Sequence, residues 1–593
     1  MEGPTAPRPP ADGSRPPRRY PDPEDPKGSG APAPPVPPTP GIPEAVLRAF
    51  GARVLDPLTA VTAPGVAPPQ PTAYIGSTLL VRGLPDAGLG GHAAVEEIKG
   101  LAEEMGLVAD VSEGDAALRR LADDAELEVL DQVWQTQVVL RRQTRDEALA
   151  SAARRAEARG EEPPSEPPAA PPPDAWRVLQ ALTSRRGSRP EDVALEHLLL
   201  SAGGFEPVGQ WGSVGEWGSV GQWGSVGQWG SVGQWGSVGQ WGSVGQWGSV
   251  GQWGSVGAAD QYGVPGLGGR TPVVWQGVDP YRPAAGKRAP VVAILDTAVG
   301  PHPWLTEKKG VTTMSLPGRP LVAPGQGLTV ELDGLLAGEA GHGTFVAGII
   351  RQRCPEAQIL VLPVVPFAGA AAEKDVHDAL ALLLARQLWA TRTGRHDALV
   401  DVVNLSLGYY HETPEDAWTQ DPPLKKLLGL LADAGVAVVA AAGNDGTSAK
   451  FYPAGFALER TATIGSQKYV PLVSVGAYNP GDSTVALFSN SGLWVTTHRP
   501  GAAVVSTVPT TMRGSMQAGV HTQRNDPTDR ALIDPDDFST GFASWSGTSF
   551  AAPVLAAEIA AALPTDETLC DTATDACVAR AKHAVATALG VTS

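Results

Sequence analysis

Short apolar runs alternate with longer amphipathic segments through the second half of this chain. Largely apolar runs, the pattern of strands buried on both faces, stand at 291–295, 359–365 and 399–405 and in the segment that ends at Asn444. Apolar positions recur at helical spacing in 374–390 and in 424–434, the second of which is closed by Gly435. The order strand, helix, strand, helix, strand predicts an α/β domain with a parallel sheet, right-handed crossovers and helices on both faces.

Polar residues with catalytic chemistry follow these apolar runs. Asp296 and Asn444 each end a strand-like run, so both are expected on the rim formed by the carboxyl ends of the strands, where ligands bind in such sheets. His342 stands between two glycines, and Ser549 stands where a turn enters an apolar helix-like segment. Asp, His and Ser in this order are one of the known chain orders of a catalytic triad.

These residue types suit nucleophilic catalysis. A Ser hydroxyl is a poor nucleophile unless a base lies within hydrogen-bond reach, and the base needs a third group that fixes its tautomer. His342 can act as the base for Ser549, and Asp296 can hold the other ring nitrogen. The amide of Asn444 and the backbone N–H of Ser549 can donate to the oxyanion of a tetrahedral intermediate. Singly, each residue has an ordinary interpretation as a cap, loop or turn residue, but the ordered set predicts a triad.

Four motifs in this order resemble the subtilisin-like serine proteases of the subtilase family. They are Ile294-Leu295-Asp296-Thr297, Gly341-His342-Gly343-Thr344, Ala441-Ala442-Gly443-Asn444 and Gly547-Thr548-Ser549. The resemblance covers roughly residues 285–593 and implies a subtilisin-like fold and a serine endopeptidase of peptidase family S8. The chain departs from the family at Ala298, where the family usually has Gly. A positive φ at Ala298 would cost about 1 kcal/mol.

A substrate-binding segment is also expected. Ser406, Leu407 and Gly408 follow the third apolar run, and a Gly at a strand end lets an extended peptide pair alongside it. In the family that the chain resembles, this stretch borders the pocket for the residue before the scissile bond. The segment that contains Ala442 and Gly443 forms the facing wall there. The alternative is an ordinary exit from strand to loop, and the sequence does not predict a cleavage specificity.

A small α+β domain is predicted at 73–142. Strand-like segments are found at 77–81, 107–111 and 133–140, with an amphipathic helix at 93–105. Its size and its place before the catalytic half are similar to the inhibitory propeptide of subtilases, and a docking or partner-recognition domain is the alternative. As a propeptide, it would send a segment through the active-site cleft and would be cut after Gly203.

The remaining segments are expected to be linkers. Residues 1–72 form a Pro-rich N-terminus that is predicted to be disordered, and 143–209 is a helical and Pro-rich linker with a helical piece at 175–200. Between 210 and 257 the hexapeptide Gln-Trp-Gly-Ser-Val-Gly repeats. A flexible linker is the favoured interpretation and a β-solenoid the alternative, because Gly at two positions in six makes the backbone costly to order. The catalytic domain is then expected at 270–593.

Composition narrows the function classes. The formal net charge of −18 disfavours non-specific nucleic-acid binding. No stretch of ~20 apolar residues could span a bilayer and no apolar signal-like region follows Met1, so a cytoplasmic location is expected, with secretion by a non-standard route left open. The three cysteines are interpreted as buried or free thiols. The triad chemistry needs no cofactor, a structural calcium is not readable, and the expected partners are a polypeptide substrate and a protein bound by the N-terminal half.

Overall fold

The structure is a computed structural model of the whole chain, and part of it is described here. The described residues are 36–83, 91–112, 129–162, 164–166, 170–201, 269–315, 334–366, 369–414, 423–457, 469–482, 484–518, 521–522 and 530–591. The predicted disorder of residues 1–35, the repeat linker at 210–257 and the cut after Gly203 therefore lie outside the described residues.

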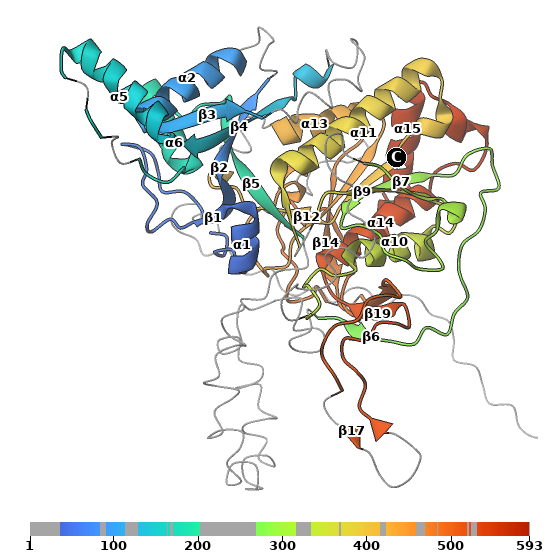
Figure 1. Cartoon of the computed structure of the whole chain (residues 1–593). Helices are drawn as coiled ribbons and strands as arrows, with labels where there is room; N and C mark the ends of the chain where they lie inside the picture. Colours follow the sequence, from blue (N-terminus) through green and yellow to red (C-terminus); the bar gives the residue numbers. More distant parts are fainter. Residues whose placement is uncertain are drawn as a thin grey trace, which may run out of the picture. The chain divides into compact units, whose positions relative to one another are not determined.

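A parallel sheet of seven strands forms the centre of the catalytic half (Figure 1). In spatial order its strands are β15 (Thr497–Pro500), β14 (Val473–Tyr478), β13 (Ala437–Ala441), β11 (Val402–Leu405), β7 (Val291–Asp296), β9 (Gln358–Pro363) and β8 (Val311–Thr313). Every neighbouring pair in this order is parallel. Core strands such as β7 are buried along their whole length, which explains their unbroken apolar runs.

Helices cover both faces of this sheet, as the alternating pattern predicts. The connecting helices are α10 (His342–Arg353), α11 (Glu373–Thr393), α13 (Pro423–Asp433), α14 (Thr548–Ala561) and α15 (Thr574–Leu589). Helix α10 connects β8 to β9, and α11 connects β9 to β11. Helix α10 packs against α14, whereas α11 packs against α13. Helix α14 packs against α10 and across the central strands (Figure 1).

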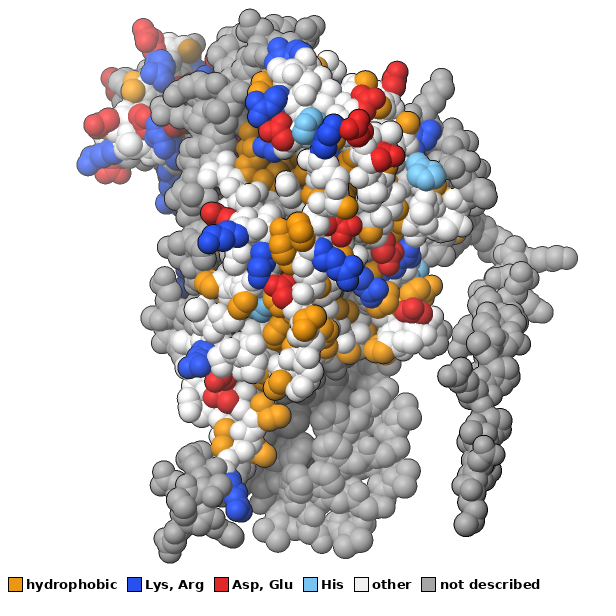
Figure 2. Space-filling model, turned by 90° about the vertical axis from the view of Figure 1, so that its right-hand side faces the viewer, with side chains coloured by type: hydrophobic (Ala, Val, Ile, Leu, Met, Phe, Trp, Pro, Cys, Tyr) orange, Lys and Arg blue, Asp and Glu red, His pale blue; other side chains and the backbone are white. Residues whose placement is uncertain are grey.

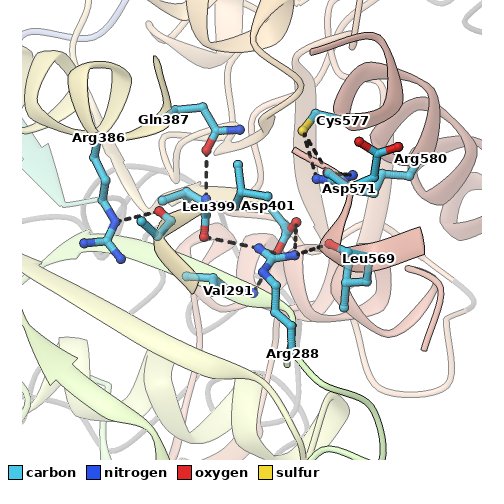
Figure 3. Close-up of polar contacts among 12 residues, drawn as sticks. Arg288, Val291, Arg386, Gln387, Leu399, Asp401, Leu569, Asp571, Cys577 and Arg580 are labelled. Carbon is cyan, nitrogen blue, oxygen red and sulfur yellow. Dashed lines mark hydrogen bonds and ion pairs between the residues drawn. The ribbon is translucent and has the colours of Figure 1, made fainter. Parts of the chain in front are cut away.

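A buried ion pair closes the amino ends of β7 and β11 (Figure 3). The guanidinium of Arg288 donates to the carboxylate of Asp401 at 2.6 and 3.1 Å and also to the carbonyls of Leu399 and Leu569. Asp401 in turn accepts the backbone N–H of Val291 at 2.8 Å. Both terminal nitrogens of Arg288 and both carboxylate oxygens of Asp401 have protein partners, while Arg288 Nε has none among the described residues, so most of the desolvation of the pair is compensated. The pair joins the two strands at the end opposite to their polar rim.

An antiparallel sheet with helices precedes the catalytic half. Its strands are β1 (Ala52–Leu55), β2 (Thr72–Arg82), β3 (Leu107–Val111), β4 (Gln135–Arg142) and β5 (Val193–Ser201). The associated helices are α1 (Glu44–Phe50), α2 (Gly91–Glu104), α5 (Arg145–Arg159) and α6 (Ala175–Arg186). Ile98 of α2 and Leu179 of α6 pack with Leu79 and Leu195 in a separate hydrophobic core. The region therefore has its own core, which a linker would lack.

Two parts of this region differ from the sequence prediction. Residues 1–72 were predicted to be disordered, yet α1 and β1 are ordered within them, with Val46 buried and β1 paired to β2. The 175–200 segment was predicted to be helical, but only α6 is a helix and 193–201 is strand β5. The physical reason is that β5 is a central strand that pairs with β2 on one side, so tertiary pairing overrides its helix-like composition.

Strand β5 also joins the two halves of the chain. Its last residues pair with β10 (Ala370–Ala372) on one side and with β12 (Leu407–Gly408) on the other, both from the catalytic half. The antiparallel sheet therefore counts seven strands, two of which the catalytic half supplies.

Two further features of the molecule are the distribution of charge on its surface and the polarity of its helices. On the face shown in Figure 2, acidic and basic side chains are interspersed with hydrophobic ones, so the net charge of −18 does not gather there in one patch. Within the described part of the chain, no helix is long and apolar enough to cross a membrane.

Candidate active site

Asp296 and His342 meet at the carboxyl end of β7. Asp296 is the last residue of β7 and His342 is the first residue of α10, and both side chains are buried. The Oδ1 atom of Asp296 lies 2.7 Å from Nδ1 of His342. The same Oδ1 accepts the backbone N–H of Thr297 at 2.7 Å, which fixes the carboxylate. Nε2 of His342 is left without a hydrogen-bond partner among the described residues.

The two glycines beside His342, Gly341 and Gly343, are each required for a different steric reason. Gly341 has φ of 82° at the start of α10, a left-handed conformation that favours glycine. A Cβ at Gly343 would collide with the carbonyl oxygen of Thr297, and the Gly343 N–H donates to the Thr297 hydroxyl at 2.8 Å. These contacts hold the first turn of α10 against the end of β7. Ala298 is not among the described non-glycine residues with positive φ, so the expected strain there is absent.

Ser549 is the second residue of α14, at the helix start. Its side chain is fully buried, and its Oγ has no hydrogen-bond partner among the described residues. The backbone N–H groups of a first helical turn have no intrahelical acceptors, so they are available to an anion. Phe550 packs on the ring of His342, with centroids 5.2 Å apart, and thereby ties the start of α14 to the start of α10.

Asn444 presents its amide beside Ser549. Its Oδ1 accepts both the backbone N–H and the hydroxyl of Thr548, at 2.8 and 2.9 Å. Because Oδ1 is used in this way, Nδ2 is the free end of the amide, and this atom is buried without a partner among the described residues. A Cβ built on Gly547 would lie 2.9 Å from Ser549 Oγ and 3.3 Å from Asn444 Nδ2, so both atoms border the same space.

Opposing effects set the proton affinity of His342. Burial lowers the pKa of its imidazole, but the Asp296 carboxylate, its hydrogen bond and the nearby Glu339 carboxylate outweigh burial. The net result is a pKa above the ordinary value of 6.5. The imidazolium is therefore stabilised where a base that takes a proton from Ser549 needs stabilisation.

The expected substrate-binding segment lies directly beside Ser549. Ser406 Oγ donates to the carbonyl oxygen of Ser549 at 2.8 Å, and Leu407 and Gly408 form β12. The loop after β13 contains Ala442 and Gly443, and Gly443 has φ of 95° and donates its N–H to the Thr548 hydroxyl at 3.1 Å. The polar residues that the sequence singled out are thus brought together at one end of the sheet.

Sequence reasoning missed Asn490, which supports this loop. Its Nδ2 donates to the carbonyl of Ala442 at 2.9 Å, and its Oδ1 accepts the N–H groups of Asp445 and Thr447 at 3.0 and 3.1 Å. Asn490 therefore holds the loop that carries Asn444. Asn490 lies in none of the four motifs, so the sequence carries no signal for this contact, which only the folded structure shows.

The second missed residue is Glu339, which lies beside the ring of His342. Glu339 Oε2 is 3.8 Å from His342 Nε2 and has no hydrogen-bond partner among the described residues. Its side chain is only 6% exposed. Burial raises the pKa of Glu339. The sequence offered a weak signal for it, namely an acidic residue three positions before the candidate base.

A segment of the N-terminal half lies between two segments of the catalytic half next to the candidate site. Ser201 pairs with Leu407, and its N–H donates to the carbonyl of Gly369 at 2.7 Å. Leu200 pairs with Gly408 on one side and with Ala370 on the other. The end of β5 is therefore bound as an extended strand between two segments of the catalytic half.

One cluster was considered as a metal site. His197, His411 and Glu412 bring ligand atoms within 4.8 Å of one another, and they are the only such group of three among the described residues. Nδ1 of His411 already accepts the N–H of Thr413 at 3.0 Å, and both ring nitrogens of His197 lie 2.6 Å from carboxylate oxygens. Calcium prefers oxygen ligands, which this histidine-rich set does not supply. We interpret the cluster as a hydrogen-bonded ion-pair network.

Comparisons with known proteins show which proteins the chain is similar to. Subtilisin BL from Lederbergia lenta is 32% identical over 222 residues, which cover 37% of this chain and 66% of the relative. The thermophilic serine proteinase from Bacillus sp. (strain AK1) is 30% identical over 226 residues, which cover 38% of this chain and 46% of the relative. The chain thus spans about half to two thirds of the length of these curated relatives.

Among solved structures, the patellamide maturation protease PatA is 21% identical, with a TM-score of 0.31, over 51% of this chain and 98% of that chain. A cold-adapted subtilisin-like serine proteinase is 20% identical, with a TM-score of 0.28, over 51% of this chain and 84% of that chain. Residues 287–582 match the family described as Peptidase_S8, the subtilase family. The chain therefore belongs to the subtilase family, the subtilisin-like serine proteases.

Proposed function

We propose that this chain is a serine endopeptidase that hydrolyses polypeptides through an acyl-enzyme on Ser549. In this mechanism His342 takes the proton of the Ser549 hydroxyl while Oγ attacks the peptide carbonyl carbon, and Asp296 holds the imidazolium that forms. His342 then returns the proton to the leaving amine, and water hydrolyses the acyl-enzyme by the same steps. Asn444 Nδ2 and the Ser549 N–H donate to the oxyanion.

The observation that carries this proposal is the arrangement of three unpaired polar atoms. His342 Nε2, Ser549 Oγ and Asn444 Nδ2 are all buried and have no hydrogen-bond partner among the described residues. Ser549 Oγ and Asn444 Nδ2 border the same space at Gly547, and Phe550 next to Ser549 packs on the His342 ring. Buried polar groups without partners are rare and costly, so this arrangement supports a function. The 2.7 Å contact between His342 and Asp296 supplies the orientation that the base needs. None of these steps requires a metal or an organic cofactor.

The decisive experiment is the Ser549→Ala substitution. It removes the only group assigned to form the acyl-enzyme, so we expect loss of peptide hydrolysis and of labelling by a serine-directed phosphonate. A matched control is Ser515→Ala, which removes a hydroxyl elsewhere in the catalytic half. Full hydrolysis by the Ser549→Ala protein would refute the assignment.

We further propose that residues 42–201 act as an intramolecular inhibitor. This is supported by the end of β5, which fills the space between β10 and β12 where an extended substrate would pair. Of the two interpretations that the sequence left open, this contact favours a propeptide over a docking domain. The inserted strand is β5, whereas the strand at 133–140 on which the sequence prediction focused is β4, inside the sheet.

An ion-pair network supports the retention of β5 in the cleft. His197 of β5 has Nδ1 2.6 Å from Glu373 Oε2 and Nε2 2.6 Å from Glu412 Oε2, and both carboxylates belong to the catalytic half. Arg189 adds a contact of 2.5 Å to Glu412. Burial lowers the pKa of His197, but the two carboxylates outweigh burial and raise it to about 10. At neutral pH His197 is therefore a cation between two carboxylates of the catalytic half.

A further inference from the structure

Glu339 is a carboxylate in the active-site cleft for which the triad mechanism has no use. It is 6% exposed, and its Oε2 has no hydrogen-bond partner among the described residues. Burying a carboxylate without a cationic partner is expensive. The nearby Arg270 does not serve as that partner, because its guanidinium donates to the carbonyls of Ala337 and Ala340 at 2.9 and 2.7 Å.

The loop that carries Glu339 is held in place. Arg270 clamps the carbonyls on both sides of Glu339, and the carbonyl of Glu339 itself accepts the His342 N–H at 3.0 Å. Arg270 is in turn fixed over the ring of Trp545, 4.9 Å from its centroid. A carboxylate on a fixed loop is preorganised, so binding a ligand costs little further ordering.

The bound end of β5 identifies what faces this carboxylate. The hydroxyl of Ser201 hydrogen-bonds to the Glu339 side chain. The Ser201 N–H donates to the carbonyl of Gly369, and its strand pairs with Leu407, as an extended peptide substrate would. The side chain that takes the place of Ser201 in any peptide bound in this way therefore points at Glu339.

The strand register shows which residue of a bound substrate takes the place of Ser201. Ser201 pairs with Leu407, so the next residue of a bound chain stands opposite Ser406. Ser406 donates to the carbonyl oxygen of Ser549 at 2.8 Å, so this next residue is the one whose carbonyl lies at the nucleophile. The residue in the place of Ser201 is consequently the second residue before the scissile bond.

We propose that Glu339 makes this subsite selective for substrates with Lys or Arg at the second residue before the scissile bond. His342 Nε2 lies 3.8 Å from Glu339 Oε2, too far for a hydrogen bond, so this oxygen has no hydrogen-bond donor among the described residues. A basic side chain would bring both a cation and N–H donors to it. The charged groups that face Glu339 are His342, Asp296 and Arg270. An acidic side chain at the same position would meet two carboxylates and be rejected. This inference rests on the proposed peptidase function.

The first test uses matched peptides that differ only at the second residue before the scissile bond, with Lys, Arg, Leu or Glu there. For the wild-type chain we expect kcat/KM for the Lys peptide to exceed that for the Leu peptide at least about tenfold. In Glu339→Gln the same ratio should fall to within about threefold of one. The ratio cancels any general change of activity. The control is Glu307→Gln, which removes an exposed carboxylate in the short helical turn Glu307–Lys309 and should keep the wild-type ratio.

Equal ratios in the wild type and in Glu339→Gln would overturn the proposal. The same holds if Glu339→Gln slows all peptides alike and only shifts the pH profile, since Glu339 would then act through His342 alone.

The second test needs no catalysis, because β5 itself is the bound peptide. In the full-length Ser549→Ala chain, Ser201→Lys is made with and without Glu339→Gln, and the Tm of each variant is measured. For each background we take the change in Tm that Ser201→Lys causes. We expect this change to be at least about 2–4 °C more positive in the chain that retains Glu339 than in the Glu339→Gln chain. Absence of this coupling would overturn the inference. If the wild type hydrolyses no peptide at all, the proposed function fails, and this second test still decides the role of Glu339.

Discussion

At the scale of single residues, the proposed mechanism makes His342 the group that sets the pH dependence of activity. As the proposed base, it must be neutral to accept the Ser549 proton, so activity should fall as pH drops through its pKa. Burial lowers this pKa, but Asp296 and Glu339 raise it above 6.5 overall. The midpoint of the acid limb of kcat/KM is therefore expected above pH 6.5, with about a tenfold fall per pH unit below it. A profile that stays flat from about pH 8 to 5 would require a different base.

The kinetics of an Asn444 variant can distinguish a role in transition-state stabilisation from a role in substrate binding. Its Oδ1 is held by Thr548, and its free Nδ2 should donate to an oxyanion that exists only during reaction. Asn444→Ala should therefore lower kcat about 10²- to 10³-fold with a smaller change in KM, a range carried over from subtilisin, a relative of this chain. Steady-state kinetics on one peptide series measures both constants. An effect on KM alone would assign Asn444 to substrate binding.

At the scale of elements, the sequence predicted what lies on one continuous strand or helix. The apolar runs and helical spacing predicted β7, β9, β11, α11 and α13, and the family motifs marked residues at their ends. Strand β5 was missed because it is buried on both faces, so its sequence lacks the alternation of a half-exposed strand. Glu339 was missed for a related reason, since its partner Ser201 is brought to it only by long-range strand pairing.

The ion-pair network around β5 predicts how firmly this element is held. His197→Gln removes the cation that lies between the carboxylates of Glu373 and Glu412. Glu412 then keeps its ion pair with Arg189, whereas Glu373 loses the cation that it faces. Breaking a buried ion pair in this way costs about 3–5 kcal/mol. Because the folded pKa of His197 is raised to about 10 from 6.5, its contribution is complete below pH 6.5 and is lost as pH rises through 10. The Tm difference between wild type and His197→Gln should thus be larger at pH 6 than at pH 10.

Labelling of Ser549 tests whether this network keeps the cleft closed. With Ser549 intact, His197→Gln should react faster with the phosphonate than the wild type does, because β5 leaves the cleft more often. The control is His583→Gln on the exposed surface of α15, which should label at the wild-type rate. Equal labelling rates for His197→Gln and wild type would mean that the network does not govern access.

At the scale of the whole molecule, the position of β5 predicts that the chain processes itself. Strand β5 ends at Ser201, which pairs with Leu407 next to Ser406, so we expect the chain to be cut in the segment that follows Ser201, where the sequence analysis predicts the cut after Gly203. Intact-mass spectrometry should find a new terminus in this segment in wild type, while Ser549→Ala stays full length. Deletion of 210–257 should leave kcat/KM nearly unchanged, because a flexible linker of this composition contributes reach rather than chemistry. A wild-type chain that remains intact and yet is fully active would mean that β5 is no inhibitor, and residues 42–201 would then be a docking module.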